Sequence, residues 1–248
     1  MSEATRDSPT DRESPTLGRV LEILESALNY RDWIFSLADP HLGKRVLEVG
    51  AGSGTMLDCV VDREHAIGLE IDPGFACAME ERFQAHPNVS VVCGSVTQSA
   101  TMQAVSALQP DSAMTFNVLE HIDDDEEALR SIASVLRPGD ALAVLVPAFP
   151  AIFGAMDRGV GHVRRYRRSD LVAKMERAGF DVPVAHYVNA VGYFAWFVNG
   201  RVLRSTAPVG GARAIDRYDR HVIPVLRRIE RSWRPPFGQS LFAVGTRR

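Results

Sequence analysis

The chain has 248 residues, enough for one well-buried core with an added lobe. Its composition, 46% hydrophobic and 24% charged, is that of an ordinary soluble globular protein, and its net charge of −3 excludes a global attraction to nucleic acid or to membrane surfaces. Three cysteines, Cys59, Cys77 and Cys93, form no C-x-x-C pair, which favours reduced thiols in a cytoplasmic protein over disulfides or a zinc site. We therefore expect no nucleic-acid partner and no metal site.

The N-terminal part of the chain divides into a tail and a helical segment. Residues 1–16 are polar and rich in Pro, Ser and Thr, without the apolar stretch of a signal peptide, and predict a disordered tail. Residues 17–43 carry apolar side chains at helical spacing and predict one or two helices before the sheet begins. The longest apolar runs, near 141–149 and 190–198, are too short to span a bilayer, so we expect no integral membrane segment.

The stretch from Val46 to Gly54 carries the strongest functional signal. It is typical of a buried parallel strand that leads into a glycine-rich turn and then a helix, where the backbone comes close to a nucleotide-like ligand. A dinucleotide-binding turn needs its third glycine at the position of Thr55, one residue after Gly54. Glu48, near the end of the strand, would repel a pyrophosphate and would suit a ligand with an ammonium group.

A second acid, Glu70, lies twenty residues after Gly50, at the carboxyl end of a strand predicted over 66–71. An acid at this place can accept hydrogen bonds from both hydroxyls of a ribose. The alternative is an exposed acid at the end of a strand, without a ligand. Asp72, followed by Pro73, is expected to cap the next helix rather than to contact a ligand.

Together these residues resemble motif I of the class I S-adenosylmethionine-dependent methyltransferases, which has two aliphatic residues around an acid and then G-x-G-x-G. The resemblance covers about residues 30–185 and includes the segment N-V-L-E-H-I at 117–122. It implies S-adenosylmethionine as the cofactor and S-adenosylhomocysteine as its product. The family's acid after the third strand is Ser95 here, so the Ser95 hydroxyl or the backbone at Val96 would have to bind the adenine. The implied cofactor-binding residues are Glu48, Gly50, Ala51, Gly52, Gly54, Glu70, Ile71, Ser95, Val96 and Asn117.

The alternation of strand and helix signals predicts an α/β fold. With the resemblance, we expect a doubly wound, seven-stranded, mostly parallel sheet in a Rossmann-like domain over 44–189 and 240–248. About fifty residues separate the last two predicted strands, where the basic fold has a hairpin. Residues 190–239 are therefore expected to form a helical insertion, either a lid over an acceptor or a homodimer contact. A third alternative, contact with a membrane surface, is disfavoured by the scarcity of lysine.

Two candidate residues follow the fourth predicted strand, over 111–116. His121 lies near the expected position of the transferable methyl group, and imidazole titrates near neutral pH, so it is a candidate catalytic base. Glu120, beside it, is a candidate substrate-binding residue. Alternatively, both side chains orient the loop or complete the start of the next helix.

A long loop over 153–168 follows the fifth predicted strand. Its last eleven residues contain five arginines, a histidine and a tyrosine, which favours contact with an anionic acceptor, since a guanidinium matches carboxylate and phosphate groups. The segment G-H-x-R-R-Y at 161–166 resembles a pattern in bacterial methyltransferases and implies a substrate or catalytic role for His162. Alternatively the loop is a solvated basic segment whose Arg165 and Tyr166 pack against the sheet. Ser169 is expected to cap the helix that follows.

The N-terminal helices are expected to cap the cofactor, because the segment 29–33 resembles the aromatic-bearing segment ahead of motif I in some of these enzymes. Tyr30 is the candidate acceptor contact there. The alternative is that Tyr30 and Trp33 only pack the helix onto the sheet. The substrate-binding set expected from the whole chain is Tyr30, Glu120, Arg164, Arg165 and Tyr166, and the catalytic set is His121 and His162.

The sequence thus predicts a cytoplasmic S-adenosylmethionine-dependent methyltransferase of secondary metabolism. The expected reaction is O-methylation of a small molecule that bears a hydroxyl or carboxyl group, with a histidine as base. Methylation of nitrogen or carbon remains an alternative, because enzymes for all three acceptor atoms share the cofactor-binding half of the fold. A nicotinamide-dependent oxidoreductase is disfavoured by Glu48 and Thr55, and a cofactor-binding protein without catalysis is a further alternative.

Overall fold

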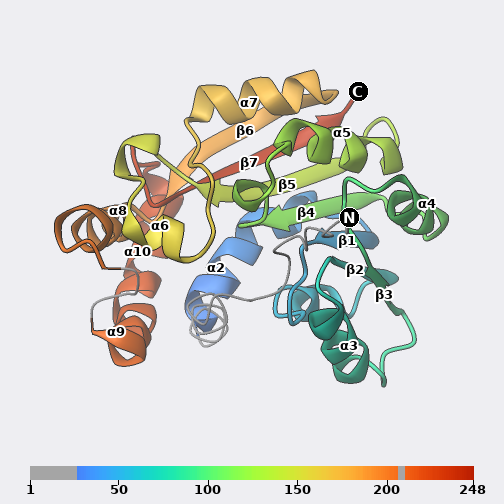
Figure 1. Cartoon of the computed structure of the whole chain (residues 1–248), viewed down its shortest axis with the longest axis horizontal. Coiled ribbons are helices and arrows are strands. Elements are labelled where there is room, and N and C mark those ends of the chain that lie inside the picture. Colours follow the sequence, from blue (N-terminus) through green and yellow to red (C-terminus); the bar gives the residue numbers. More distant parts are fainter. Residues whose placement is uncertain (1–26, 206–209) are drawn as a thin grey trace, which may run out of the picture.

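The computed structural model describes residues 27–205 and 210–248, so the predicted tail at 1–16 and the first part of the predicted cap lie outside the described residues. Seven strands form one sheet in the order β3-β2-β1-β4-β5-β7-β6, in which β7 is antiparallel to both of its neighbours. This confirms the predicted doubly wound, mostly parallel sheet (Figure 1). The strands are β1 (Arg45–Val49), β2 (His65–Glu70), β3 (Val89–Cys93), β4 (Ser112–Phe116), β5 (Ala141–Pro147), β6 (Phe180–Val188) and β7 (Ser240–Arg247).

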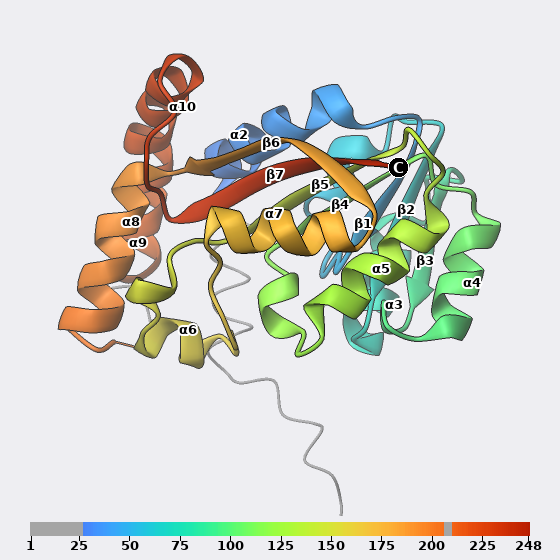
Figure 2. The same ribbon diagram turned by 90° about the horizontal axis from the view of Figure 1, so that it is seen from above.

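Helices cover both faces of the sheet (Figures 1 and 2). One apolar core lies between the sheet and α4, α5 and α7, and a second lies between the opposite face and α2, α3 and α10. The central strand β5 is buried along almost its whole length, as its unbroken apolar sequence requires. The α-helices are α2 (Leu28–Ala38), α3 (Pro73–Arg82), α4 (Ser99–Ala107), α5 (Asp125–Val135), α6 (Ala155–Gly159), α7 (Arg168–Arg177), α8 (Ala190–Phe197), α9 (Gly211–Arg217) and α10 (Ile223–Ser232).

Short helical turns complete the chain, and two local expectations are wrong. A short helix predicted over 55–62 is the 3₁₀ turn η2 (Leu57–Val60). Ser169 lies inside α7, whose N-cap is Arg167, because its hydroxyl bonds to the neighbouring Asp170 instead of to the helix amides. The other turns are η1 (Asp39–His41), η3 (Leu119–His121), η4 (Pro150–Ile152) and the π-helical η5 (Val198–Val202) and η6 (Tyr218–Val222).

The segment between β6 and β7 contains α8, η5, α9, η6 and α10 and is attached to the N-terminal helix α2. The buried Asp219 of η6 accepts hydrogen bonds from the backbone amides of Asn29 and Tyr30, at 3.0 and 2.8 Å. At the start of α8, the carboxylate of Glu230 accepts from the amides of Asn189 and Ala190. Figure 2 shows α2 and α10 on the same side of the sheet. These contacts make the cap helix and the late helices one layer.

Candidate active site

The carboxyl ends of β1, β2, β4 and β5 lie at one edge of the sheet, around the point where the strand order changes direction between β1 and β4. In open α/β sheets a crevice opens at such a point, because successive helices leave to opposite faces. Most of the residues proposed from sequence follow these four strands.

The turn after β1 needs glycine for two different reasons. Gly50, Gly52 and Gly54 all have positive φ, at +74°, +53° and +82°, which side chains other than glycine rarely adopt. A Cβ on Gly50 would lie 2.4 Å from Val118, whereas a Cβ on Gly52 would meet no atom within 4 Å. Gly50 is therefore required by packing, and Gly52 leaves open space above the turn.

The two predicted acids border this open space. Glu70 accepts hydrogen bonds from the backbone amides of Gly52 and Asp72, at 2.8 and 2.9 Å, which fixes the turn to the end of β2. Glu48 is buried, and its Oε2 has no hydrogen-bond partner among the described residues. Burial, with the nearby Glu70 and Asp58 carboxyls, raises the pKa of Glu48 well above its usual value. A ligand ammonium group would supply both the missing donor and a countercharge, so these residues fit S-adenosylmethionine.

The remaining predicted cofactor residues flank the same edge. Ile71 is 67% exposed directly after β2, an unusual position for a large aliphatic side chain with no ligand beside it. The side chain of Val96 is buried in the core, so only its backbone is open to a ligand. The Ser95 hydroxyl lies 2.9 Å from that of Thr97, and Asn117 is exposed after β4 with φ +56°.

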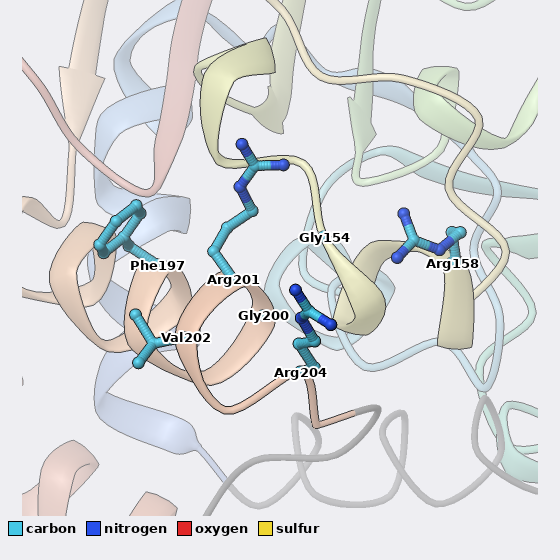
Figure 3. A pocket seen from close by; sticks show the side chains of 7 residues that line it. All are labelled: Gly154, Arg158, Phe197, Gly200, Arg201, Val202 and Arg204. Atoms are coloured by element: carbon cyan, nitrogen blue, oxygen red, sulfur yellow. The ribbon is translucent and has the colours of Figure 1, made fainter.

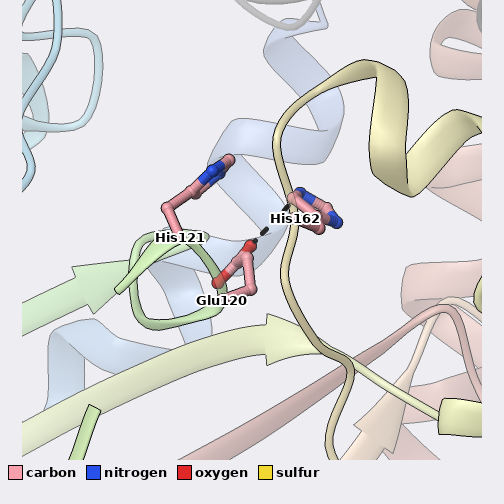
Figure 4. A group of neighbouring side chains, drawn as sticks. All are labelled: Glu120, His121 and His162. Atoms are coloured by element: carbon pink, nitrogen blue, oxygen red, sulfur yellow. Dashed lines mark ion pairs between the residues drawn. The ribbon is translucent and has the colours of Figure 1, made fainter. Parts of the chain in front are cut away.

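The structure brings together both candidate bases and one candidate substrate residue (Figure 4). Glu120 and His121 lie in η3, directly after β4, and His162 comes from the loop after α6. The two imidazole rings meet edge to face with their centroids 4.8 Å apart, and His162 Nε2 is 3.7 Å from Glu120 Oε1. The Glu120 side chain is 0% exposed, and neither of its oxygens has a hydrogen-bond partner among the described residues. Burial raises its pKa to about 8.

Asp157 is a further candidate residue, which the sequence did not single out. Its buried carboxylate accepts hydrogen bonds from His162 Nδ1 at 3.0 Å and from Arg165 Nε at 2.6 Å. It also accepts from the Gly154 amide and the Trp196 indole, at 2.9 and 3.1 Å. Burial opposes ionisation of Asp157, but the hydrogen bond from His162 and the charge of Arg165 outweigh it and lower the pKa of the acid. The only sequence signal is an acid five residues before a histidine in an arginine-rich loop.

This arrangement determines how His162 is protonated. A carboxylate accepts only, so the neutral imidazole must carry its proton on Nδ1, and its Nε2 lone pair faces Glu120. His121 differs, because the partly enclosed position of its ring and the adjacent His162 lower the pKa of His121 to about 4. Of the two rings, His162 is the one that a buried carboxylate holds in a fixed orientation.

The arginines predicted to bind an acceptor have partners within the chain. Arg165 is buried, and its Nε and Nη1 donate to Asp157 and to the carbonyl of Ala148, whereas its Nη2 has no partner among the described residues. Arg164 forms an ion pair with Asp125 at 3.0 Å, and the buried Tyr166 donates a hydrogen bond to Asp125 at 2.7 Å. These contacts favour the packing alternative for Arg165 and Tyr166. Binding of an acceptor by Arg164, Arg165 or Tyr166 stays a prediction.

Tyr30 also follows its packing alternative. Its ring meets Trp33 edge to face at 6.2 Å, and its hydroxyl lies 3.5 Å from that of Ser240. Trp33 itself is buried against the sheet. Contact between Tyr30 and an acceptor stays a prediction.

A different set of arginines has no carboxylate partner within residues 27–205 and 210–248. Arg158, Arg201 and Arg204 line a cavity of about 510 Å³ between α6 and the end of η5 (Figure 3). Two of its lining residues, Arg158 and Phe197, are the chain neighbours of Asp157 and Trp196, which are hydrogen-bonded to each other. Its other lining residues are Gly154, Phe197, Gly200 and Val202.

Residues 27–183 match the family model described as "Methyltransferase domain". The chain belongs to this methyltransferase-domain family. The match covers the glycine turn, both acids and the histidine cluster, and it confirms the family and the cofactor, S-adenosylmethionine, predicted from motif I. It ends before the late helices, which the family model leaves undescribed.

Curated relatives of this methyltransferase domain are distant. A Mycolicibacterium smegmatis protein named probable S-adenosylmethionine-dependent methyltransferase is 28% identical over 149 residues, 59% of this chain and 55% of that protein. The ubiquinone biosynthesis O-methyltransferase of Vibrio vulnificus is 27% identical over 111 residues, 44% of this chain and 46% of that protein. The chain thus spans about half the length of the curated relatives it matches.

Solved structures share the fold of this methyltransferase domain. CalH, a methyltransferase in complex with S-adenosylhomocysteine, has a TM-score of 0.59 at 16% identity and covers 92% of this chain and 59% of that chain. The [4+2]-cyclase SpnF has a TM-score of 0.59 at 16% identity, over 94% and 95% of the two chains. A likeness at this identity shows the fold alone, and the cyclase shows that the fold does not fix the reaction. No helix of the described residues is both long and apolar enough to cross a membrane.

Proposed function

We propose that this protein transfers the methyl group of S-adenosylmethionine to a hydroxyl oxygen of a small molecule. The observation that carries the proposal is the Asp157–His162 pair, in which the carboxylate holds the imidazole with its Nε2 lone pair on the side of Glu120, just after β4. The cofactor supplies an activated methyl group and a neutral thioether leaving group. The protein therefore has to align the acceptor and receive its proton.

His162 would receive that proton on Nε2. As the hydroxyl oxygen forms its bond to the methyl carbon, the imidazole becomes an imidazolium, and the buried Asp157 carboxylate at 3.0 Å stabilises the new charge. The same hydrogen bond holds the ring in one orientation, whereas a loop histidine without such a partner could rotate. N-methylation and C-methylation need no such paired base when the acceptor is already nucleophilic, so the pair favours an oxygen acceptor.

The cavity beside this pair indicates what kind of acceptor fits. Arg158, Arg201 and Arg204 offer positive charge without a carboxylate partner in the described part of the chain, while Phe197 and Val202 offer apolar surface. An acceptor with an anionic group and an apolar portion would satisfy both. The Vibrio vulnificus relative, named as an O-methyltransferase of ubiquinone biosynthesis, lends support to an oxygen acceptor.

The test combines cofactor binding with labelled methyl transfer. Calorimetry should show that the wild type binds S-adenosylmethionine and S-adenosylhomocysteine, and the protein with methyl-labelled cofactor should label an acidic, apolar fraction of a bacterial small-molecule extract. Mass spectrometry of the product then reports the linkage. Label on nitrogen or carbon would contradict the oxygen acceptor. Tight cofactor binding without transfer to any fraction would favour the alternative of a binding protein.

A further inference from the structure

We propose that Glu120, His121 and His162 bind a first-row divalent cation, with Zn²⁺ as the preferred ion. One ligand atom from each of the three side chains lies within 4.8 Å of the others (Figure 4). The sequence predicts no metal site, because His162 is about forty residues from the Glu120–His121 pair and only the fold brings it there. The binding of the ion is independent of the proposed reaction, and its effect on an acceptor rests on that reaction.

The first observation is the unsatisfied carboxyl group of Glu120. Both oxygens are buried, and neither finds a hydrogen-bond donor among the described residues. Buried polar groups in folded proteins are nearly always paired, since an unpaired one forfeits its hydration without replacement. The charge of the buried Arg165 acts on Glu120, but its Nε and Nη1 donate to Asp157 and Ala148, and its Nη2 forms no hydrogen bond with Glu120. A cation seated between Glu120 and the imidazoles would provide the missing partner.

The second observation is the hydrogen bond that orients His162. Its Nδ1–H is donated to the Asp157 carboxylate at 3.0 Å, which leaves Nε2 on the side of Glu120. Metal-binding histidines almost always have such an acceptor on the nitrogen that does not bind the ion. The ring of His121 lies next to that of His162, with the centroids 4.8 Å apart, so a second imidazole is within reach of the same buried carboxyl group.

The donor atoms determine which ions fit. Two imidazole nitrogens and one carboxylate suit Zn²⁺ and other borderline first-row ions, whereas Mg²⁺ and Ca²⁺ prefer oxygen ligands throughout. Ligand atoms around a tetrahedral Zn²⁺ lie about 3.4 Å apart for bonds of about 2.1 Å. His162 Nε2 and Glu120 Oε1 are near this value at 3.7 Å. His121 is exposed, so its ring can rotate inward to complete the set.

Three protein ligands leave a fourth position open, as in catalytic zinc sites. An ion there would lower the pKa of a hydroxyl group that reached it and would occupy the Nε2 lone pair of His162. The ion, rather than the imidazole, would then activate the acceptor. Methyl transfer from the same cofactor is common to both arrangements.

Metal titration of the full chain tests the proposal. The protein is stripped with a chelator and titrated with Zn²⁺ by calorimetry and with Co²⁺ by visible absorption. We expect one ion per chain for the wild type. Glu120→Gln, His121→Asn and His162→Asn should each weaken binding by at least about 100-fold. The matched control is His221→Asn, because His221 is an exposed histidine of η6, and it should bind like the wild type.

Stability without metal separates a ligand from a structural side chain. Glu120→Gln keeps the size of the side chain and breaks no hydrogen bond of the described residues, so the metal-free variant should melt close to the metal-free wild type. Zn²⁺ should raise the melting temperature of the wild type and leave that of the variant unchanged. S-adenosylhomocysteine affinity confirms that each variant is folded.

The failure of this proposal is distinguishable from that of the proposed function. A wild type that binds no ion, or equal affinity in all variants, would overturn the metal site. Full methyl transfer by the stripped enzyme would also overturn the ion's role and support His162 as the base. One tightly bound ion with no methyl transfer would retain the metal site and contradict the proposed reaction.

Discussion

At the scale of single residues, the crevice is defined by polar groups with unusual environments. Glu48 and Glu120 are buried carboxyl groups that have oxygens without partners, and Asp157 is a buried carboxylate with four donors. The unpartnered oxygens of the first two could accept from a ligand, while Asp157 holds other side chains in place. Carboxyl groups of similar burial thus differ according to what surrounds them.

Cofactor affinity should depend on Gly52 and Glu70. Gly52→Val should weaken binding of S-adenosylhomocysteine at least about tenfold, since a side chain there fills the open space above the turn. Glu70→Ala should weaken it about 10- to 100-fold through the loss of hydrogen bonds. Calorimetry measures both.

Gly139→Val is the matched control for Gly52→Val. Gly139 also has positive φ and open space around its Cβ position, but it lies in the turn before β5. The control should lose similar stability and keep its cofactor affinity. Unchanged affinity in Gly52→Val would contradict the site.

Turnover should depend on Asp157. Asp157→Asn removes the charge that stabilises the imidazolium and the acceptor that fixes the His162 tautomer, so kcat should fall about 10²- to 10⁴-fold with a small change in KM. Steady-state kinetics on the identified acceptor measures this. Trp196→Phe removes one donor from the same carboxylate and keeps an aromatic ring stacked beside His162, so it should keep most of the turnover. Equal losses in both variants would indicate that Asp157 acts only on loop structure.

At the scale of elements, the arginine-rich loop over 153–168 is held against α5 and the sheet by hydrogen bonds and ion pairs. Asp125, at the start of α5, accepts a hydrogen bond from Tyr166 and forms ion pairs with Arg164 and with Lys174 of α7. The sequence showed the positive charges of the loop but not their partners, since Asp125 is about forty residues away in the chain. Charge without geometry cannot separate a ligand site from an ion-pair network.

The Asp125 network should make stability depend on pH. Although burial opposes ionisation of Asp125, hydrogen bonds from Lys174 and Tyr166 lower its pKa. Because the pKa of Asp125 is lower in the folded protein, its carboxylate stabilises the fold at pH values above its pKa in the unfolded chain, near 3.9. This contribution is lost as the pH falls through the lower pKa of the folded protein. The difference in unfolding free energy between the wild type and Asp125→Asn, from urea titrations, should therefore be constant above about pH 5 and shrink below about pH 4. A constant difference down to pH 2.5 would contradict the assignment.

At the scale of the whole molecule, the late helices add a layer that the methyltransferase-domain match does not include. They are joined to α2 through Asp219 and flank the cavity that Arg201 and Arg204 line. Most of the exposed large hydrophobic side chains of the described residues lie on them or at their ends, among exposed arginines. Exposed apolar side chains gathered in this way favour a protein contact.

We expect a homodimer through α10. Val225, Ile229 and Trp233 are exposed at helical spacing and form one apolar stripe. Sedimentation analysis should show a dimer for the wild type and a monomer for Ile229→Glu. Ile71→Glu places the same charge on another exposed isoleucine, at the cofactor edge, so it should remain dimeric while losing cofactor affinity. A monomeric wild type would contradict the prediction.

The sequence by itself determined the fold class, the family and the cofactor. The glycine turn and the spacing of Glu48 and Glu70 are local consequences of a strand that ends in a tight turn, so they can be read from neighbouring residues. Only the tertiary structure decided which side chains from the loops after β4 and β5 meet one another. It paired Arg164, Arg165 and Tyr166 with buried acids, and it set His162 beside Glu120 and His121 with Asp157 behind it. These contacts join loops far apart in the chain, and their partners depend on packing, which spacing in the sequence does not encode.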